Sequence, residues 1–272
     1  MTQTTDKESI GENATATRQT FLLFCPGHEF VVPYLERLLG EKWTVVTRLQ
    51  DCDDPDRAVM LSSTDIYDVE SGLNYDEETP VYPESSWNAD ERMFEGYCRQ
   101  RDLTPTIIRC ANTVGTGMKG LPMDLARGIF RGTLRHIAVP RVKHETRLRK
   151  NTEVAQRPEA LLSVIHATDV AVAAELLSRP GRQPEQSEIF NLSDNTQTDI
   201  NDLIDALAHR VNDKHVGSAS PFWARMLNGR RIWRAMNRSL TFNPMKILRV
   251  TGIEPHPVTE YLRTHVYDES SL

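Results

Sequence analysis

The 272-residue chain is predicted to be an α/β protein built on a parallel β-sheet. Two observations support this fold class. Short apolar runs of strand length alternate with segments of helical periodicity, and this alternation is typical of parallel strands joined by helical crossovers. The runs are of the fully buried type, which indicates a sheet covered by helices. The composition, 39% hydrophobic and 26% charged, is that of an ordinary globular protein.

The first unit reads strand, helix, strand. Residues 20–27, "TFLLFCPG", form an apolar run closed by Pro-Gly. Residues 31–40, "VVPYLERLLG", predict a helix, because Pro33 stands near its start and Gly40 suits its end. The second strand is "KWTVVTR", residues 42–48.

The pattern then continues through a polar turn to a third strand. Residues 58–64, "AVMLSST", form a buried type of strand that stops at a serine and threonine cluster. A helix is predicted at 85–102, and its apolar face includes Phe94. The next strand is "TPTIIRCAN", residues 104–112.

Beyond residue 112 the pattern is looser. A helix is predicted at 122–132, a strand and helix at 161–177, and a short strand at 188–193. Thr168 or Asp169 is the expected cap of the helix in 161–177. The helix in 198–211 is expected to be capped by Thr198 or Asp199. The last part, 220–266, is basic, aromatic and partly helical, and we expect its residues Phe222, Trp223 and Trp233 to pack against a core.

Charge and cysteine content limit the function. The formal net charge is −6, which argues against broad attraction to nucleic acid or anionic lipid, so we predict no nucleic-acid and no membrane partner. The four cysteines have no metal-ligand spacing, so we predict reduced thiols and no metal site. No apolar stretch is long enough for a membrane span, and residues 1–18 are expected to be a disordered tail of a cytoplasmic protein. The basic run 141–150 is interpreted as a solvated loop.

Six segments, taken in order, resemble the extended short-chain dehydrogenase/reductase family, the NAD(P)-dependent epimerases and dehydratases of nucleotide sugars. The first three segments are "FCPGHEFVVPYL", "LSSTDIYD" and "EETPVYPESSWNADERMFE". The others are "IIRCANTVGTG", "SVIHATDVAVA" and "TFNPMKILRVTGIEPHPVTEYL". The resemblance implies a Rossmann-like parallel sheet at 19–115 and 160–193, with a small, mostly helical substrate-side lobe at 116–159 and 194–272.

The cofactor turn departs from the family pattern. The family's three glycines allow a tight turn and close approach of backbone N–H groups to pyrophosphate. This chain has Pro26, Glu29 and Val32 at those places, and Gly27 stands beside them. Proline removes a donor and glutamate brings a like charge toward phosphate. The resemblance implies NAD or NADP as cofactor, with Gly27 and Arg48 as its contacts, but these substitutions act against binding.

The sheet is also expected to be smaller than is usual in the family. About ten polar residues join 42–48 to 58–64, where the family inserts two further strands and their helices. A parallel crossover with a helix needs at least about 10 to 12 residues. Either strands are missing, or 58–64 occupies a different position in the sheet.

The catalytic helix carries the third departure. In the family a tyrosine transfers the proton, and a lysine one turn later lowers its pKa. Trp87 and Glu91 occupy those two places, and an indole has no accessible acid–base equilibrium. Thr64 matches the family's substrate-orienting residue and Tyr67 the motif's tyrosine. We also expect Trp87 to line the core or a pocket and Glu91 to face solvent.

The substrate side of the family pattern is better preserved. Asn112 matches an asparagine that touches the nucleotide diphosphate, although an asparagine at a strand end can also satisfy turn backbone groups. His166 and Asp169 match a family motif but are interpreted as structural residues at a strand end and a helix start. Arg109 is interpreted as structural as well.

Two functional hypotheses follow. In the first, the protein is a binding, regulatory or assembly subunit whose oxidoreductase machinery is lost, with a nucleotide sugar as possible ligand and a homodimer or a heterodimer with a paralogue as possible assembly. In the second, it is an active epimerase, dehydratase or reductase on a nucleotide sugar. Thr64 would then orient the substrate, and Tyr67, Tyr82 or Glu91 would move the proton.

Overall fold

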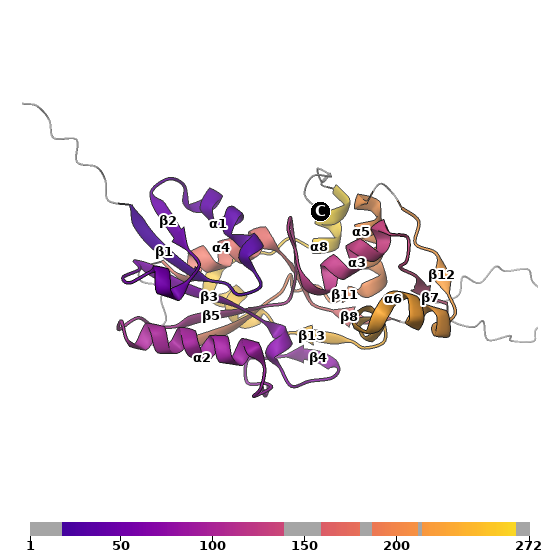
Figure 1. The fold of residues 1–272 in the computed structure, drawn as a ribbon, viewed down its shortest axis with the longest axis horizontal. Helices are drawn as coiled ribbons and strands as arrows, with labels where there is room; N and C mark the ends of the chain where they lie inside the picture. The colour runs from indigo at the N-terminus through magenta and orange to yellow at the C-terminus, as the bar shows by residue number, and fades with distance from the viewer. Residues whose placement is uncertain (1–17, 139–158, 180–186, 212–213, 265–272) are drawn as a thin grey trace, which may run out of the picture.

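A computed structural model describes residues 18–138, 159–179, 187–211 and 214–264 (Figure 1). Its centre is a five-stranded sheet in the order β10-β5-β3-β1-β2, and every pairing in it is parallel. The strands are β1 (Gln19–Phe24), β2 (Trp43–Val46), β3 (Arg57–Ser63), β5 (Thr106–Cys110) and β10 (Glu188–Leu192). The predicted α/β fold with a Rossmann-like parallel sheet is confirmed.

The short link between β2 and β3 determines the sheet order. It spans residues 47–56, contains only the short turn η2 (Leu49–Asp51), and carries the chain past β1, so that β3 pairs directly with β1. Ten extended residues reach at most about 33–36 Å. This is enough to return from the end of β2 to the start of β3, because β2 has only four residues. The sheet is therefore smaller, as predicted, and β3 lies directly beside β1.

Helices cover both faces of the sheet. On one face α1 (Val32–Leu39), α4 (Ala167–Leu177) and α7 (Met245–Thr251) pack on side chains that include Leu23 and Leu61. On the other face α2 (Ser86–Arg99) packs through Phe94 on Leu22 and Met60. Neighbouring residues of each strand thus enter different cores, which is why the strand sequences are continuously apolar.

A further core, separate from those on the two faces of the sheet, lies in a part that we call the helical lobe. Its helices are α3 (Gly120–Phe130), α5 (Ile200–Arg210), α6 (Pro221–Ala235) and α8 (Val258–Thr264). The short strands are β4 (Gly72–Tyr75), β6 (Asn112–Val114), β7 (His136–Ile137), β8 (Leu161–Leu162), β9 (Val164–His166), β11 (Thr198–Asp199), β12 (Ser218–Ala219) and β13 (Leu240–Phe242). Among the described residues they form three smaller sheets, β11-β8-β13-β4, β12-β7 and β6-β9. The predicted mostly helical C-terminal lobe is confirmed.

Local details differ from some expectations. The cap of α4 is His166, whose Nδ1 accepts from the N–H of Thr168 at 3.2 Å, so the predicted cap, Thr168 or Asp169, was wrong. Asp199 caps α5, as one of the two predicted residues. Phe222 and Trp223 are exposed, so the expectation that they pack against a core was wrong, whereas Trp233 packs against the core of the helical lobe as expected.

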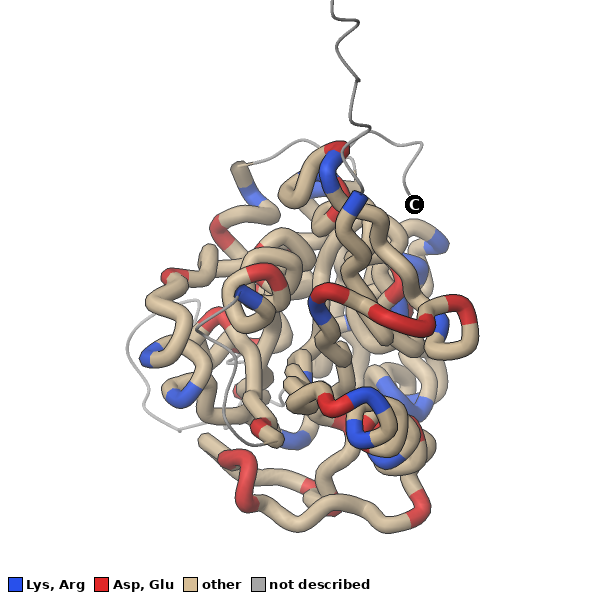
Figure 2. Tube along the Cα trace, turned by 90° about the vertical axis from the view of Figure 1, so that its left-hand side faces the viewer, with Lys and Arg blue, Asp and Glu red and all other residues tan. Residues whose placement is uncertain are grey.

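Some predictions fall outside the described residues. These are the tail, except for Arg18, and the basic run 141–150. No helix in the described ranges is both long enough and apolar enough to cross a membrane. At the sheet end of the molecule, acidic and basic positions are interspersed along the trace (Figure 2).

Candidate functional site

The site lies where the chain changes direction in the sheet. From β1 the chain goes to β2 on one side and then to β3 on the other, so the carboxyl ends of β1 and β3 flank a crevice. In open α/β sheets ligands bind at such a switch point. Two neighbouring cavities are found there, an inner one of about 270 Å³ and an outer one of about 410 Å³. Both are lined by Thr64, Asp65, Asn112, Leu121 and Arg231, and together we call them the cleft.

The turn after β1 carries the inner cavity's anion-binding position. Gly27 has a φ of +77°, which glycine adopts without strain. Its N–H donates to the Glu29 carboxylate at 3.0 Å, and Glu29 also accepts from Lys119 Nζ at 2.7 Å. Burial would raise the pKa of Glu29, but the bonds from Lys119 and from backbone N–H groups outweigh it and lower the pKa. The chain's own carboxylate therefore occupies the backbone donor that a phosphate would use.

The indole of Trp87 covers the same turn. A Cβ added to Gly27 would lie 2.9 Å from Cη2 of Trp87, so the ring already lies in contact with the backbone there. The ring of His28 packs beside it, with centroids 5.5 Å apart. Burial lowers the pKa of His28 to about 4, so the imidazole is neutral near pH 7. The expectation that Trp87 lines a core or pocket is confirmed.

The residues present do not fit a dinucleotide as they stand. Pyrophosphate needs free backbone donors and room at the glycine turn, and here Glu29 takes a donor while Trp87 takes the room. Arg48 follows β2 as an exposed residue and lines neither cavity of the cleft. Of the two cofactor residues indicated by the sequence, the structure thus places Gly27 in the cleft and Arg48 outside it.

Thr64 and its neighbour Asp65 form the floor shared by the two cavities. Both belong to the short turn η3 (Thr64–Ile66), which Ser63 caps by accepting from the N–H of Asp65 at 3.1 Å. Thr64 is buried, as a substrate-orienting group at a strand end would be. Desolvation by the cleft walls raises the pKa of Asp65, and Arg231 opposes that shift. Sequence reasoning missed Asp65, although its position directly after Thr64 in the strand-end motif could have indicated it.

Tyr67 lines the outer cavity, but its hydroxyl is held by the protein. Its hydroxyl donates to Asn191 Oδ1 at 2.6 Å, and its ring stacks on Phe242. The guanidinium of Arg109 lies 4.9 Å from the ring centroid. Burial raises the pKa of Tyr67, which makes proton release at neutral pH harder. Tyr82, the other tyrosine considered for proton transfer, is exposed and lines neither cavity.

Glu91 forms a buried ion pair with Arg109. Two hydrogen bonds join them, Nε to Oε1 at 3.0 Å and the terminal nitrogen to Oε2 at 2.8 Å. Both side chains are buried, so the expectation that Glu91 faces solvent was wrong. Burial would lower the pKa of Arg109, but Glu91 outweighs it and raises the pKa, so the guanidinium stays charged. The family lysine's position is thus taken by half of a structural pair, and Arg109 is structural as expected.

Of the substrate-side residues of the sequence prediction, Asn112 lies in the cleft, and His166 and Asp169 line neither of its cavities. Asn112 lines both cavities, and its Nδ2 donates to the carbonyl of Ser163 at 3.0 Å, which fixes the side chain. His166 caps α4, and Asp169 binds His256 at 2.8 Å, so both have structural partners as predicted.

Three arginines of the helical lobe complete the cleft, and sequence reasoning did not assign them to it. Arg231, Arg234 and Arg238 line the outer cavity opposite Asp65 and Glu70. Arg238 lies 3.7 Å from Glu70, and Arg231 lies 3.3 Å from Asp124. Their spacing over α6 and its end brings them to one wall, which makes the outer cavity cationic on that side.

Solved structures share this fold. An NADPH complex of RMD from Pseudomonas aeruginosa has a TM-score of 0.61 and 16% identity, over 91% of this chain and 96% of that one. A putative epimerase from Burkholderia cenocepacia gives 0.59 and 16%, over 91% and 96%. UDP-glucose 4-epimerase from Thermotoga maritima with UDP-glucose gives 0.58 and 14%, over 90% and 96%. At these identities the likeness concerns the fold alone.

The sequence itself matches a family model. No match was found among curated proteins. The model of the NAD-dependent epimerase/dehydratase family matches residues 34–193, more than half of the chain, and begins just after the turn that holds Pro26 and Glu29. Together with the parallel sheet and the cleft at its switch point, this match establishes that the chain belongs to the NAD-dependent epimerase/dehydratase family.

Proposed function

We propose that this protein is a nucleotide-sugar-binding member of its family without dinucleotide-dependent catalysis, a pseudoenzyme that acts as a binding or regulatory subunit. One observation carries the proposal: Glu29 and Trp87 occupy the donor and the space at Gly27 that a pyrophosphate needs. Trp87 and Glu91 also replace the family's proton-transfer pair, and Glu91 is committed to Arg109. The cofactor side of the cleft is therefore closed by the chain itself.

The substrate side supports a phosphorylated ligand. Guanidinium groups bind phosphate oxygens with two parallel hydrogen bonds, and Arg231, Arg234 and Arg238 face the outer cavity. Thr64 and Asn112 add hydroxyl and amide groups that can bind sugar hydroxyls. The Thermotoga maritima neighbour was solved with UDP-glucose, and we infer a nucleoside diphosphate sugar as the ligand class here too.

The remaining assignments extend the same proposal. Residues 19–115 and 160–193 would form the Rossmann-like core, and 116–159 and 194–272 the substrate-side lobe. The protein would work in the cytoplasm, either as a homodimer or with an active paralogue.

Calorimetry with separate ligands tests the proposal. UDP-glucose and UDP should bind measurably, whereas NAD, NADP and their reduced forms at millimolar concentration should give no heat and no change in melting temperature. Arg234→Gln should weaken UDP binding, while Arg225→Gln, on the same helix but outside the cleft lining, should not. Binding of a nicotinamide dinucleotide, or its reduction on a sugar nucleotide, would overturn the proposal.

One observation favours the alternative of an active enzyme. Asp65 lies next to Thr64 on the cleft floor, and desolvation raises the pKa of its carboxyl, which is the direction that favours a general acid–base role. Tyr67 and Glu91, both considered for that role from the sequence, are tied to Asn191 and Arg109. An active enzyme would therefore lose turnover in Asp65→Asn but keep it in Tyr67→Phe, and comparison of these two variants in a sugar-nucleotide assay separates the alternatives.

A further inference from the structure

Helix α6 presents apolar side chains outward. Phe222, Trp223 and Met226 have 65%, 55% and 63% of their surface exposed, and Leu227 is exposed as well. They lie on one arc of the helix, because residues four apart share a face. The opposite arc carries Ala224 and Asn228, which are buried. An exposed cluster of this kind is typical of an interaction surface.

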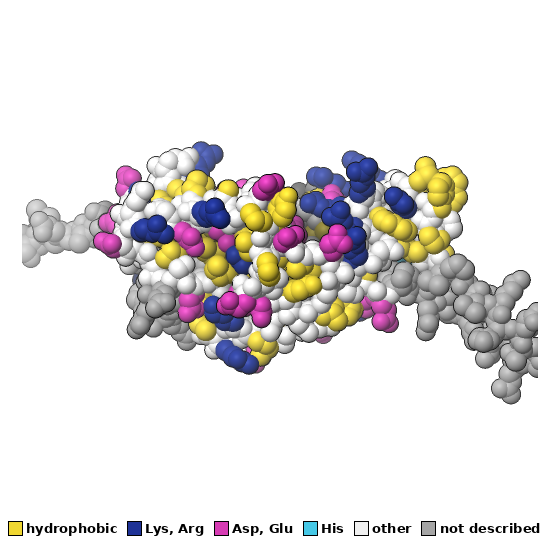
Figure 3. Space-filling model, turned by 90° about the horizontal axis from the view of Figure 1, so that it is seen from below, with side chains coloured by type: hydrophobic (Ala, Val, Ile, Leu, Met, Phe, Trp, Pro, Cys, Tyr) yellow, Lys and Arg dark blue, Asp and Glu magenta, His cyan; other side chains and the backbone are white. Residues whose placement is uncertain are grey.

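The same helix is strongly basic. Residues 214–253 contain eight Lys or Arg and no Asp or Glu. Within α6 the cations are Arg225, Arg230, Arg231 and Arg234. In the view from below, hydrophobic side chains at the lobe end lie close to a group of Lys and Arg side chains (Figure 3). The surface therefore combines aromatic residues with positive charge.

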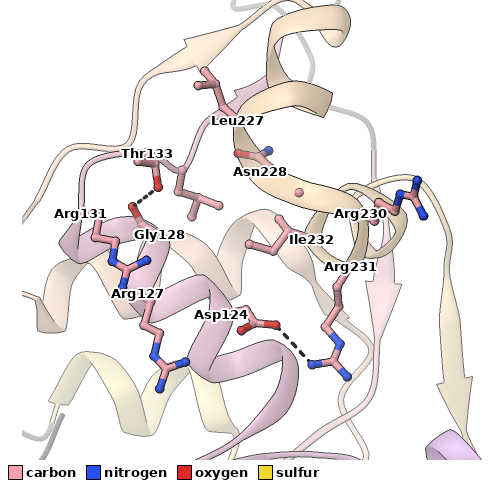
Figure 4. Close-up of a pocket in the computed structure, with 12 residues that line it drawn as sticks. Asp124, Arg127, Gly128, Arg131, Thr133, Leu227, Asn228, Arg230, Arg231 and Ile232 are labelled. Carbon is pink, nitrogen blue, oxygen red and sulfur yellow. Dashed lines mark hydrogen bonds and ion pairs between the residues drawn. The ribbon is translucent and has the colours of Figure 1, made fainter.

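A groove between α3 and α6 adds further arginines to this surface. It has a volume of about 390 Å³ and is lined by Arg127 and Arg131 of α3 and by Leu227 and Arg230 of α6. Figure 4 shows the two helices on either side of it. Among the residues that line it, Asp124 is the one carboxylate, and Asp124 is paired with Arg231. We call it the arginine groove, and its excess charge is positive.

We propose that this end of the helical lobe docks on a membrane surface rich in anionic phospholipid. Phe222, Trp223 and Met226 would insert at the boundary between headgroups and acyl chains, where aromatic side chains and Met find an apolar environment. Arg127, Arg131 and Arg230 would bind headgroup phosphates at the arginine groove. The net charge of −6 does not oppose this, because the cations are concentrated at one end while acidic and basic positions mix at the other (Figure 2).

Charge complementarity argues against two other occupants. Residues 139–158 continue from Ala138, whose N–H donates to Ala219 at 2.8 Å just before α6, but they contain six Lys or Arg against two Glu. They would bring like charge to the groove. A second copy of the chain, paired symmetrically through α6, would likewise face arginine with arginine.

The apolar side chains distinguish a lipid surface from an acidic polymer. They project from the exposed arc of α6, and the headgroup region of a lipid bilayer can surround them. Nucleic acid would leave Met226 and Leu227 in contact with water. The test is sedimentation of the whole protein with vesicles of neutral phosphatidylcholine, with or without a third of phosphatidylglycerol. We expect binding to the anionic vesicles, weakened by salt, and little binding to the neutral ones.

Matched variants distinguish binding through this surface from nonspecific binding to vesicles. Met226→Gln and the pair Phe222→Ser with Trp223→Ser should weaken binding on the order of tenfold. Met93→Gln on α2 should not, although Met93 is also half exposed on a helix. The pair Arg127→Gln and Arg131→Gln should weaken it about 25-fold, since each cation near an anionic surface contributes a factor of about five. Arg92→Gln with Arg99→Gln is the control.

Melting temperatures verify that each variant is folded. The proposal is overturned if the folded wild-type protein does not sediment with anionic vesicles at low salt. It is also overturned if the Met93 variant loses as much binding as the Met226 variant. If the protein binds duplex DNA or polyglutamate as well as it binds anionic vesicles, and the variant Phe222→Ser with Trp223→Ser keeps that binding, the surface binds an acidic polymer instead.

Discussion

The indole of Trp87 lies against Gly27, so close that a Cβ on the glycine would be 2.9 Å from the ring. On the other side of the turn, the Gly27 N–H donates to Glu29, which Lys119 holds in place. Helix α2, the β1 turn and the start of the helical lobe are therefore joined at one glycine. The residue aligned with the family's proton-transferring tyrosine thus packs on the glycine turn and lines the inner cavity.

Opening that contact should restore dinucleotide binding. The variant Glu29→Gly with Trp87→Ala frees the Gly27 donor, removes a charge that repels phosphate, and makes space at the turn. The freed donor and the removed charge should each contribute on the order of 1 kcal/mol or more, or about tenfold in affinity. Calorimetric titration with NAD should then give measurable binding that the wild-type protein lacks, while Trp223→Ala, far from the turn, leaves binding absent. If the double variant still gave no measurable NAD binding, Pro26 and the reduced sheet would be sufficient to exclude the dinucleotide.

Breaking the ion pair between Glu91 and Arg109 should lower the free energy of unfolding strongly. Glu91→Met or Arg109→Met leaves the other charge buried without its partner, which costs about 3–5 kcal/mol in the free energy of unfolding. Replacing both, Glu91→Met with Arg109→Met, should recover most of that loss, because two apolar side chains need no charge partner. Urea unfolding of the four proteins gives the coupling energy.

A surface pair is the matched control for that cycle. Glu175 lies on α4 and Arg179 just beyond its end; the two side chains are joined at 2.8 Å, and Arg179 is half exposed. Their coupling should be at most about 0.5 kcal/mol, because water screens an exposed pair. A coupling of Glu91 with Arg109 as small as that of the control would contradict the assignment of a desolvated structural pair.

The sequence was sufficient for the strands and helices around the sheet. The runs 20–27 and 58–64 predict strands because both faces of β1 and β3 are buried, so residues 21–24 and 58–61 are all apolar. These strand predictions depend only on local burial, which a short stretch of sequence records. The position of Thr64 at the cleft is predicted instead from the resemblance to the family, and Thr64 lies directly after β3.

Long-range pairing was not predictable from the same information. Glu91 looks like an exposed helical residue, and nothing near it in the sequence identifies Arg109 on β5 as its partner. The outward face of α6 is a similar case: periodicity shows that Phe222 and Met226 share a face, but not that the face points to solvent. Its direction depends on how Ala224 and Asn228 pack in the lobe, and on a break in the helix at Gly229.

Protonation of Asp194 should make stability depend on pH between about 4 and 6. Burial raises the pKa of Asp194 to about 6, above its ordinary value of 3.8, although N–H donors from Val258 and Thr196 oppose the shift. The folded protein then holds a proton that the unfolded chain has released, so this group's stabilisation is present at pH 4 and is lost as the pH rises through 6. The total change is on the order of 3 kcal/mol at about 1.4 per pH unit.

The variant Asp194→Asn isolates that contribution. Other carboxylates titrate in the same range, so the quantity to measure is the difference in unfolding free energy between wild type and variant at each pH. Because the amide does not titrate, the advantage of the wild type should be largest near pH 4 and should shrink toward pH 7. A difference that stays constant, or grows with pH, would show that Asp194 is ionised in the folded protein throughout.

Arg234 should contribute to ligand affinity through its charge and its fork of donors. It lines the outer cavity with Arg231 and Arg238, and those two have acidic neighbours, Asp124 and Glu70, within 4 Å. Arg234→Gln should weaken UDP binding about tenfold or more, since a charge-assisted hydrogen bond contributes about 1.5–3 kcal/mol. Arg234→Lys should recover part of the affinity, because lysine keeps the charge but not the bidentate geometry. The affinity for uridine, which has no phosphate, should be unaffected, and an equal loss for uridine and UDP would mean that Arg234 only shapes the cavity.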